Sequence, residues 1–188
     1  EGFTAKGNQL HASSGNGNQR EIELFGDPAR IIRDGDTGNL EGTRIDFKEL
    51  GRSAQVKGSG RIRFITDRTF EGKKLETPMP IDIYWSEYMD FQKQSAKFVG
   101  SIRVVMSDGA TQDVELLCAG LTVYFANDVS LGPKEADGGF ATFSESGGSA
   151  ADEKGQIERI ECHSKVTLKA EQSVDSALVA RYDAAFAD

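Results

Sequence analysis

The segment RIDFKELGRSAQVKGSGRIRF, residues 44–64, determines the fold class. A strand ending in an apolar residue, Asp and Phe leads through a short polar turn into a longer strand with apolar or small residues at every second position. A second copy, YMDFQKQSAKFVGSIRV, follows at residues 88–104. Self-similarity at a spacing of about 20–50 residues is typical of chains built from stacked units. Because one hairpin cannot bury its apolar face alone, the copies are expected to stack on one another.

The same alternation of apolar and polar residues extends along most of the chain. A period of two predicts strands with one buried and one solvated face. Residues 67–80 hold charges and two prolines and are interpreted as a connection, while residues 174–186 fit either a further copy or a short terminal helix. The predicted strands lie near residues 20–32, 40–47, 54–66, 81–91, 96–106, 113–125 and 157–169.

These strands predict an all-β, antiparallel protein. Residues 1–188 are interpreted as a single elongated domain with unequal repeats at about 8–66, 81–131 and 157–188. Residues 132–156 are rich in Gly, Ser and acids, which predicts a flexible loop.

The composition excludes several classes of protein. The formal net charge of -8 argues against nucleic acid as a partner, because phosphate binding needs clustered Lys and Arg. No run of about 18 apolar residues is present, so no membrane-spanning helix is predicted. The chain begins at Glu1 without a Met and ends within an apparent copy. We expect that a leader or an upstream region was removed and that the chain is a piece of a longer protein.

No motif of catalysis or metal binding stands out. His163 follows Cys162 directly, and neighbours on a strand point to opposite faces, which disfavours a Cys–His dyad. Residues 34–38, DGDTG, are similar to the opening of a calcium loop, but the position that needs an acid is Ile45. Carboxylates are scattered over solvated faces. We therefore expect no enzyme, no metal and no cofactor.

The two cysteines, Cys118 and Cys162, each lie in a strand-like run. An even count in a chain poor in Cys permits one disulfide if the two strands are adjacent. Two free buried thiols that act as small hydrophobic groups are the equally good alternative.

The apolar strand faces are the better candidate for a binding site. The chain holds 11 Phe, many of them at strand positions of one parity. Each alone is most simply a core residue. The functional alternative is a folded-over sheet that does not close fully and leaves an apolar groove for acyl chains. Small residues on that face either make room or bend the strand. The candidate ligand-lining residues are Phe47, Val56, Ile62, Phe64, Phe91, Phe98 and Ile102.

Three short runs carry a family resemblance: LFGDPA at residues 24–29, GTRIDF at 42–47 and VKGSG at 56–60. They resemble the OstA-like (organic solvent tolerance) periplasmic family, which includes the LptA and LptC components of lipopolysaccharide transport. The second copy, from Met89 onward, fits the same scheme. The resemblance covers about residues 8–125 well and the C-terminal strands weakly. The long 132–156 insertion and the unequal copies depart from the family pattern.

The resemblance implies an antiparallel β-jellyroll or β-taco, in which two sheets fold over an apolar interior. It further implies a periplasmic or cell-envelope protein that binds or conveys lipopolysaccharide or another acylated amphiphile between its sheets, with other OstA-like domains joined through edge strands. The alternative is a non-catalytic structural or interaction module that assembles by edge-strand pairing. An all-β carbohydrate-active enzyme ranks last, because no acid pair is identifiable.

Overall fold

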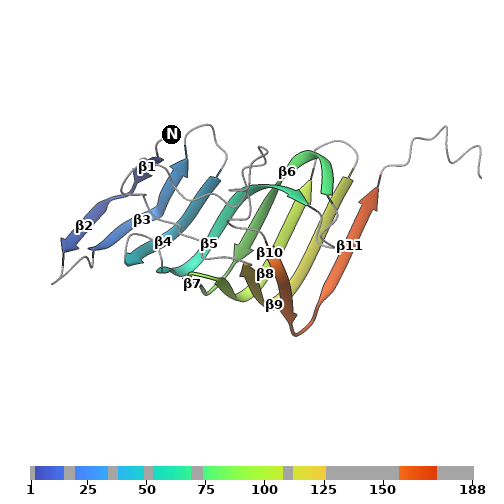
Figure 1. Ribbon diagram of the computed structural model, residues 1–188. Coiled ribbons are helices and arrows are strands. Elements are labelled where there is room, and N and C mark those ends of the chain that lie inside the picture. The colour runs from blue at the N-terminus through green and yellow to red at the C-terminus, as the bar shows by residue number, and fades with distance from the viewer. Residues whose placement is uncertain are drawn as a thin grey trace, which may run out of the picture.

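The described part of the chain forms one antiparallel sheet of eleven strands (Figure 1). A computed structural model describes residues 3–14, 20–33, 38–48, 53–68, 74–107, 112–125 and 157–172. The strands are β1 Phe3–Lys6, β2 Gln9–Ser14, β3 Arg20–Arg33, β4 Gly38–Lys48, β5 Ser53–Arg68, β6 Lys74–Trp85, β7 Tyr88–Gln92, β8 Ser95–Ser107, β9 Gln112–Phe125, β10 Ile157–His163 and β11 Thr167–Gln172. These residues contain no helix, so the all-β, antiparallel prediction is confirmed.

Four details of the strand prediction are wrong. The strand predicted at 81–91 is two strands, β6 and β7, and the strand at 157–169 is likewise divided into β10 and β11. Residues 74–80 belong to β6 rather than to a connection. Its two prolines are tolerated because, among the described residues, β8 pairs with residues 81–84 and only β5 pairs with residues 74–80. The strands β1 and β2 were not predicted. The segments 132–156 and 174–186 lie outside the described residues.

The ladder is interrupted near the middle of the long strands β3, β4, β5, β8 and β9. Register shifts fall at residues 25–29 of β3, 42–44 of β4 and 99–102 of β8. Residues 86–87 separate β6 from β7 at the same level, and residues 164–166 separate β10 from β11. These breaks lie side by side across the sheet, and we call their line the crease.

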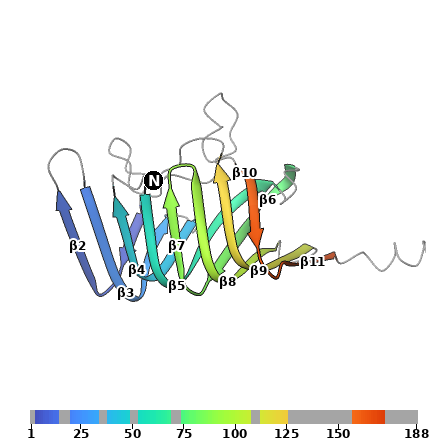
Figure 2. The ribbon, with the colours of Figure 1, turned by 90° about the horizontal axis from the view of Figure 1, so that it is seen from below.

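The crease divides the sheet into two arms of eight strand segments each, as Figure 2 shows from below. The first arm runs β2, β3 (20–25), β4 (44–48), β5 (53–57), β7, β8 (95–99), β9 (120–125) and β10. The second arm runs β1, β3 (29–33), β4 (38–42), β5 (60–68), β6, β8 (102–107), β9 (112–118) and β11.

The glycine of each sequence copy lies in the crease. Gly58 and Gly100 occupy equivalent positions in the two copies, and both have φ of +80°. Only glycine adopts this backbone region without strain. Gly58 and Gly100 therefore bend the strand. Of the two roles expected for small residues on this face, bending the strand or making room, they have the first. Ala54 has the other role, because it makes room opposite Phe47 and Phe91 within a row of the first arm.

Candidate functional site

The candidate site is the apolar interior between the two arms. In the first arm, large and small side chains alternate across the strands: Phe47 lies opposite Ala54, Ala54 opposite Phe91, and Phe91 opposite Ala96. All four are buried. A small residue beside each ring leaves space for it, so the rings fit side by side within the row.

Side chains of the two arms meet across this interior. The rings of Trp85, from the second arm, and Phe98, from the first, lie 5.3 Å apart between centroids. The Trp85 side chain is 3% exposed, and its indole N–H donates a hydrogen bond to the carbonyl oxygen of Gly58 at 3.1 Å. The ring is thereby fixed between the crease and the first arm. Trp85 therefore contacts both arms from within the interior.

A gap remains between the arms beside these rings. Its volume is about 10 Å³, close to the space of one water molecule. It is lined by apolar residues of both arms: Ile62, Phe64, Ile83, Met89, Ala96, Phe98, Val123 and Phe125. This gap is too small for an acyl chain, which can enter here only if the arms separate or side chains move.

The interior reaches the two edges of the sheet, where its side chains are exposed. Leu10 of β2 pairs with the buried Leu24 and therefore faces inward, yet it is 54% exposed. Leu168 of β11 pairs with the buried Leu116 and is 62% exposed. Described residues cover neither side chain. The apolar lining therefore continues from the core to both ends.

All seven candidate ligand-lining residues are buried in this interior. Ile62, Phe64 and Phe98 line the gap, and the other four, Phe47, Val56, Phe91 and Ile102, belong to the same core cluster. Their role toward a ligand stays a prediction. Trp85 and Met89 were not predicted as lining residues. Both belong to the apolar residues at odd positions between 81 and 91, and this alternation could have identified them.

Cys118 and Cys162 lie on the paired strands β9 and β10, both as free thiols. Cys118 is buried and Cys162 packs against the core at its margin. Burial raises the pKa of Cys118 to about 11, and the neighbouring Cys162 thiol adds to the rise. The adjacency needed for a disulfide is present, and the bond itself stays a prediction. His163 is exposed while Cys162 contacts the core, as expected for neighbours on a strand.

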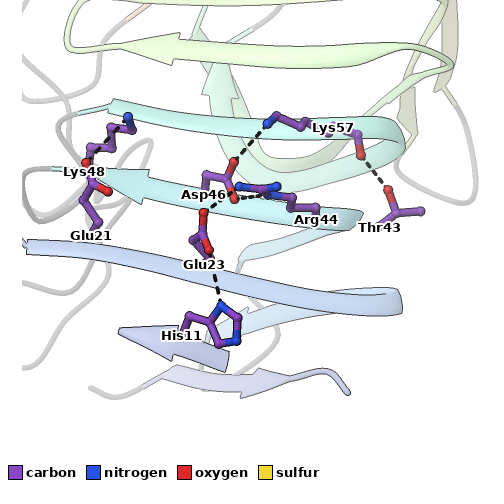
Figure 3. Close-up of polar contacts among 8 residues, drawn as sticks. All are labelled: His11, Glu21, Glu23, Thr43, Arg44, Asp46, Lys48 and Lys57. Atoms are coloured by element: carbon purple, nitrogen blue, oxygen red, sulfur yellow. Dashed lines mark hydrogen bonds and ion pairs between the residues drawn. The ribbon is translucent and has the colours of Figure 1, made fainter. Parts of the chain in front are cut away.

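The outer face of the first arm carries paired charges (Figure 3). Arg44 donates to Asp46 at 2.7 Å and contacts Glu23, whose second oxygen lies 3.5 Å from the ring of His11. Lys57 reaches the other oxygen of Asp46 at 3.6 Å. Each acid of this group has a cationic or imidazole partner. These ion pairs satisfy the buried Asp46 and its more exposed neighbours on the outer sheet face.

The second arm has a similar arrangement around Asp82. Burial favours the neutral carboxyl, but hydrogen bonds from Arg63 and Arg61 outweigh it and lower the pKa of Asp82. The Arg63 guanidinium binds both carboxylate oxygens, at 2.8 and 3.0 Å. An acid that is ionised and doubly paired cannot act as a general acid near neutral pH. Asp82 therefore joins Arg61 and Arg63 across the paired strands β5 and β6.

Metal binding and membrane insertion by a helix find no support in the described residues. No group of three or more His, Cys, Asp or Glu side chains in that part of the chain could hold a metal ion. Over the same ranges, no helix has the length and apolar character to cross a membrane. The calcium-like segment at 34–38 lies largely outside the described residues.

Comparison with known proteins gives no match for this chain: no family model, curated protein or solved structure is similar to it.

Proposed function

We propose that the chain is an OstA-like cell-envelope protein that binds an acylated amphiphile, such as lipopolysaccharide, between the two arms of a β-taco. The observation that carries the proposal is the interior itself. Apolar side chains of both arms surround it, and its lining continues to exposed leucines at both ends, Leu10 and Leu168. The short runs at residues 24–29, 42–47 and 56–60 support the family, and with it a periplasmic location.

Acyl burial would supply the affinity. Each CH₂ removed from water contributes about 0.8 kcal/mol, so a chain of about ten CH₂ groups would gain roughly 8 kcal/mol before any opening. Because the gap holds about 10 Å³, this gain must exceed the cost of separating the arms. Separation is favoured at the ends, where Leu10 and Leu168 already lack covering residues in the described structure. We therefore expect an acyl chain to enter at an edge rather than through the crease.

The experiment is a titration of the protein with a fluorescent fatty acid. Wild type is expected to take up the probe saturably, and Phe98→Leu is expected to bind more weakly while it stays folded. A near-volume-conserving apolar swap costs about 1–1.5 kcal/mol of stability. Tyr88→Leu is the matched control, since Tyr88 alternates with the buried Met89 and lies on the outer face. No uptake by the wild type below the aggregation concentration would refute the proposal.

A second candidate is a structural module that assembles through its sheet edges. The exposure of every described β2 side chain favours it, as does the exposure of Leu168 on β11. An unpaired edge with apolar side chains is a template for strand addition. Light scattering would then show association of the wild type that Leu168→Lys abolishes. Thr167→Lys, on the outward face of the same strand, should affect it less. A monomer at all concentrations would exclude self-assembly through this edge.

A further inference from the structure

The two cysteines lie on opposite sides of the crease. Cys118 is the last inward-facing residue of β9 in the second arm, where it pairs with Ile102. Cys162 belongs to β10 in the first arm and pairs with Leu121, the first buried residue of β9 beyond the crease. A backbone hydrogen bond of 3.1 Å from Ala119 N–H to the Ser164 carbonyl oxygen fixes the two strands beside the pair. The cysteines are thus diagonal neighbours that belong to different arms.

Their side chains meet inside the core margin. Burial raises the pKa of Cys118, and the Cys162 thiol is near enough to raise it further. Cys118 belongs to the hydrophobic cluster against which Cys162 packs. Cys118 is 6% exposed, whereas Cys162 is half-buried. An external reagent therefore reaches Cys162 first. In a thiol–disulfide exchange, Cys162 would therefore react first with an external disulfide, and Cys118 would react second with Cys162.

We propose that Cys118 and Cys162 form a disulfide that joins the two arms across the crease at the β10–β11 end of the interior. The oxidant is a disulfide compound, either oxidised glutathione or a thiol–disulfide oxidoreductase. The Cys162 thiolate attacks one oxidant sulfur, forms a mixed disulfide and releases one thiol. The Cys118 thiolate then attacks the Cys162 sulfur and expels the second thiol. The two protein thiols lose two protons and two electrons, and the two released thiols carry them.

The bond would limit how far the arms can separate at this end. In the reduced protein, hydrogen bonds and packing alone hold β10 against β9 beside the crease. A covalent link there keeps the crease angle close to its resting value. The effect on ligand entry rests on the proposed function, whereas formation of the bond does not. The experiment therefore measures the two separately.

The bond is tested on the full chain by incubating the folded protein with oxidised glutathione. The expected product is a monomer that has lost the mass of two hydrogens, has no thiol reactive after denaturation, and gives a peptide linking Cys118 to Cys162. The melting temperature should rise by about 5–10 °C, because the closed loop restricts the unfolded chain. Cys162→Ala should show no rise. Two free thiols after prolonged oxidation, or only intermolecular dimers, would overturn the proposal.

The restraint on the arms is tested by uptake of the fluorescent fatty acid in both redox states. Oxidised wild type should bind the probe at least several-fold more slowly than reduced wild type, and Cys162→Ala should be insensitive to the oxidant. Equal rates with the disulfide in place would overturn the restraint and leave the bond established. No uptake in either state would refute the proposed ligand, and the mass and melting data would still decide on the disulfide.

Discussion

Replacement of Gly60 by alanine tests the packing of the crease. An alanine Cβ at this position would lie 2.3 Å from Cζ2 of Trp85 and 2.4 Å from the carbonyl oxygen of Glu41. Neither neighbour can move easily. The Trp85 ring is held by its hydrogen bond to Gly58 and by Phe98, and the Glu41 backbone belongs to the β4–β5 ladder.

The expected destabilisation of Gly60→Ala follows from this geometry. Overpacking of a well-filled core costs about 1–3 kcal/mol, and two rigid neighbours place this variant at about 2–3 kcal/mol. For a chain of this size, each kcal/mol lowers the melting temperature by about 2–4 °C, so a loss of about 4–12 °C is expected. The double variant with Trp85→Phe should be less destabilised than the sum of the single variants, because one of the two contacts is relieved.

The assay is urea unfolding followed by circular dichroism of the strand signal, which does not depend on the altered environment of Trp85. Gly38→Ala is the matched control on the neighbouring strand. Its added Cβ would find one atom, the Arg63 carbonyl oxygen, at 3.7 Å, an ordinary contact. We expect this control to lie within about 0.5 kcal/mol of wild type. If Gly60→Ala is as stable as Gly38→Ala, the crease is not packed as described.

Two further predictions concern the crease and the outer face. Gly100 has φ of +80°, so Gly100→Ala should lose about 1–2 kcal/mol, and the larger Gly100→Asn should lose less because Asn tolerates positive φ better; equal losses in urea unfolding would count against backbone strain as the cause. The pKa of Asp82 is lowered on folding, so its contribution to stability is present above the unfolded pKa near 4 and is lost as the pH falls through the lower folded pKa. Asp82→Asn should therefore be destabilised at pH 7, and its stability should fall less than that of wild type below pH 4; parallel acid profiles would contradict this assignment.

The fold class was predictable because alternation is a direct consequence of burying one sheet face. The crease was not, since its effect on alternation differs between strands. In β8 the buried parity is even on both sides, from Phe98 to Ile102. In β9 it changes from even at Cys118 to odd at Leu121. The reason is that residues 99–101, an odd number, separate the buried positions of β8, whereas residues 119–120, an even number, separate those of β9. The break in a single strand can therefore be recognised from its sequence only when the register with the partner strand is known.

The edge strands and the state of the interior were also beyond the sequence. In QLHASS, residues 9–14, only Leu10 and Ala12 alternate with polar residues, which is too short a pattern to predict a strand, and all described β2 side chains are exposed. The parity of residues 44–64 and 88–104 grouped the seven candidate residues, and all seven are buried, while their role toward a ligand stays a prediction. Whether that interior is open depends on contacts between arms, such as Trp85 against Phe98, which no local pattern encodes.

The most direct measurement for the central claim is quenching of Trp85 fluorescence by a brominated fatty acid. Trp85 is the one tryptophan of the chain, and it lies in the interior against Phe98. If an acyl chain enters between the arms, the brominated chain should quench this residue saturably, and the unbrominated chain of equal length should not. In the control variant Tyr84→Trp with Trp85→Phe, the tryptophan moves to the outer face of the same strand and should be quenched little. No quenching of Trp85 below the micelle concentration, or equal quenching at both positions, would contradict an acyl-binding interior.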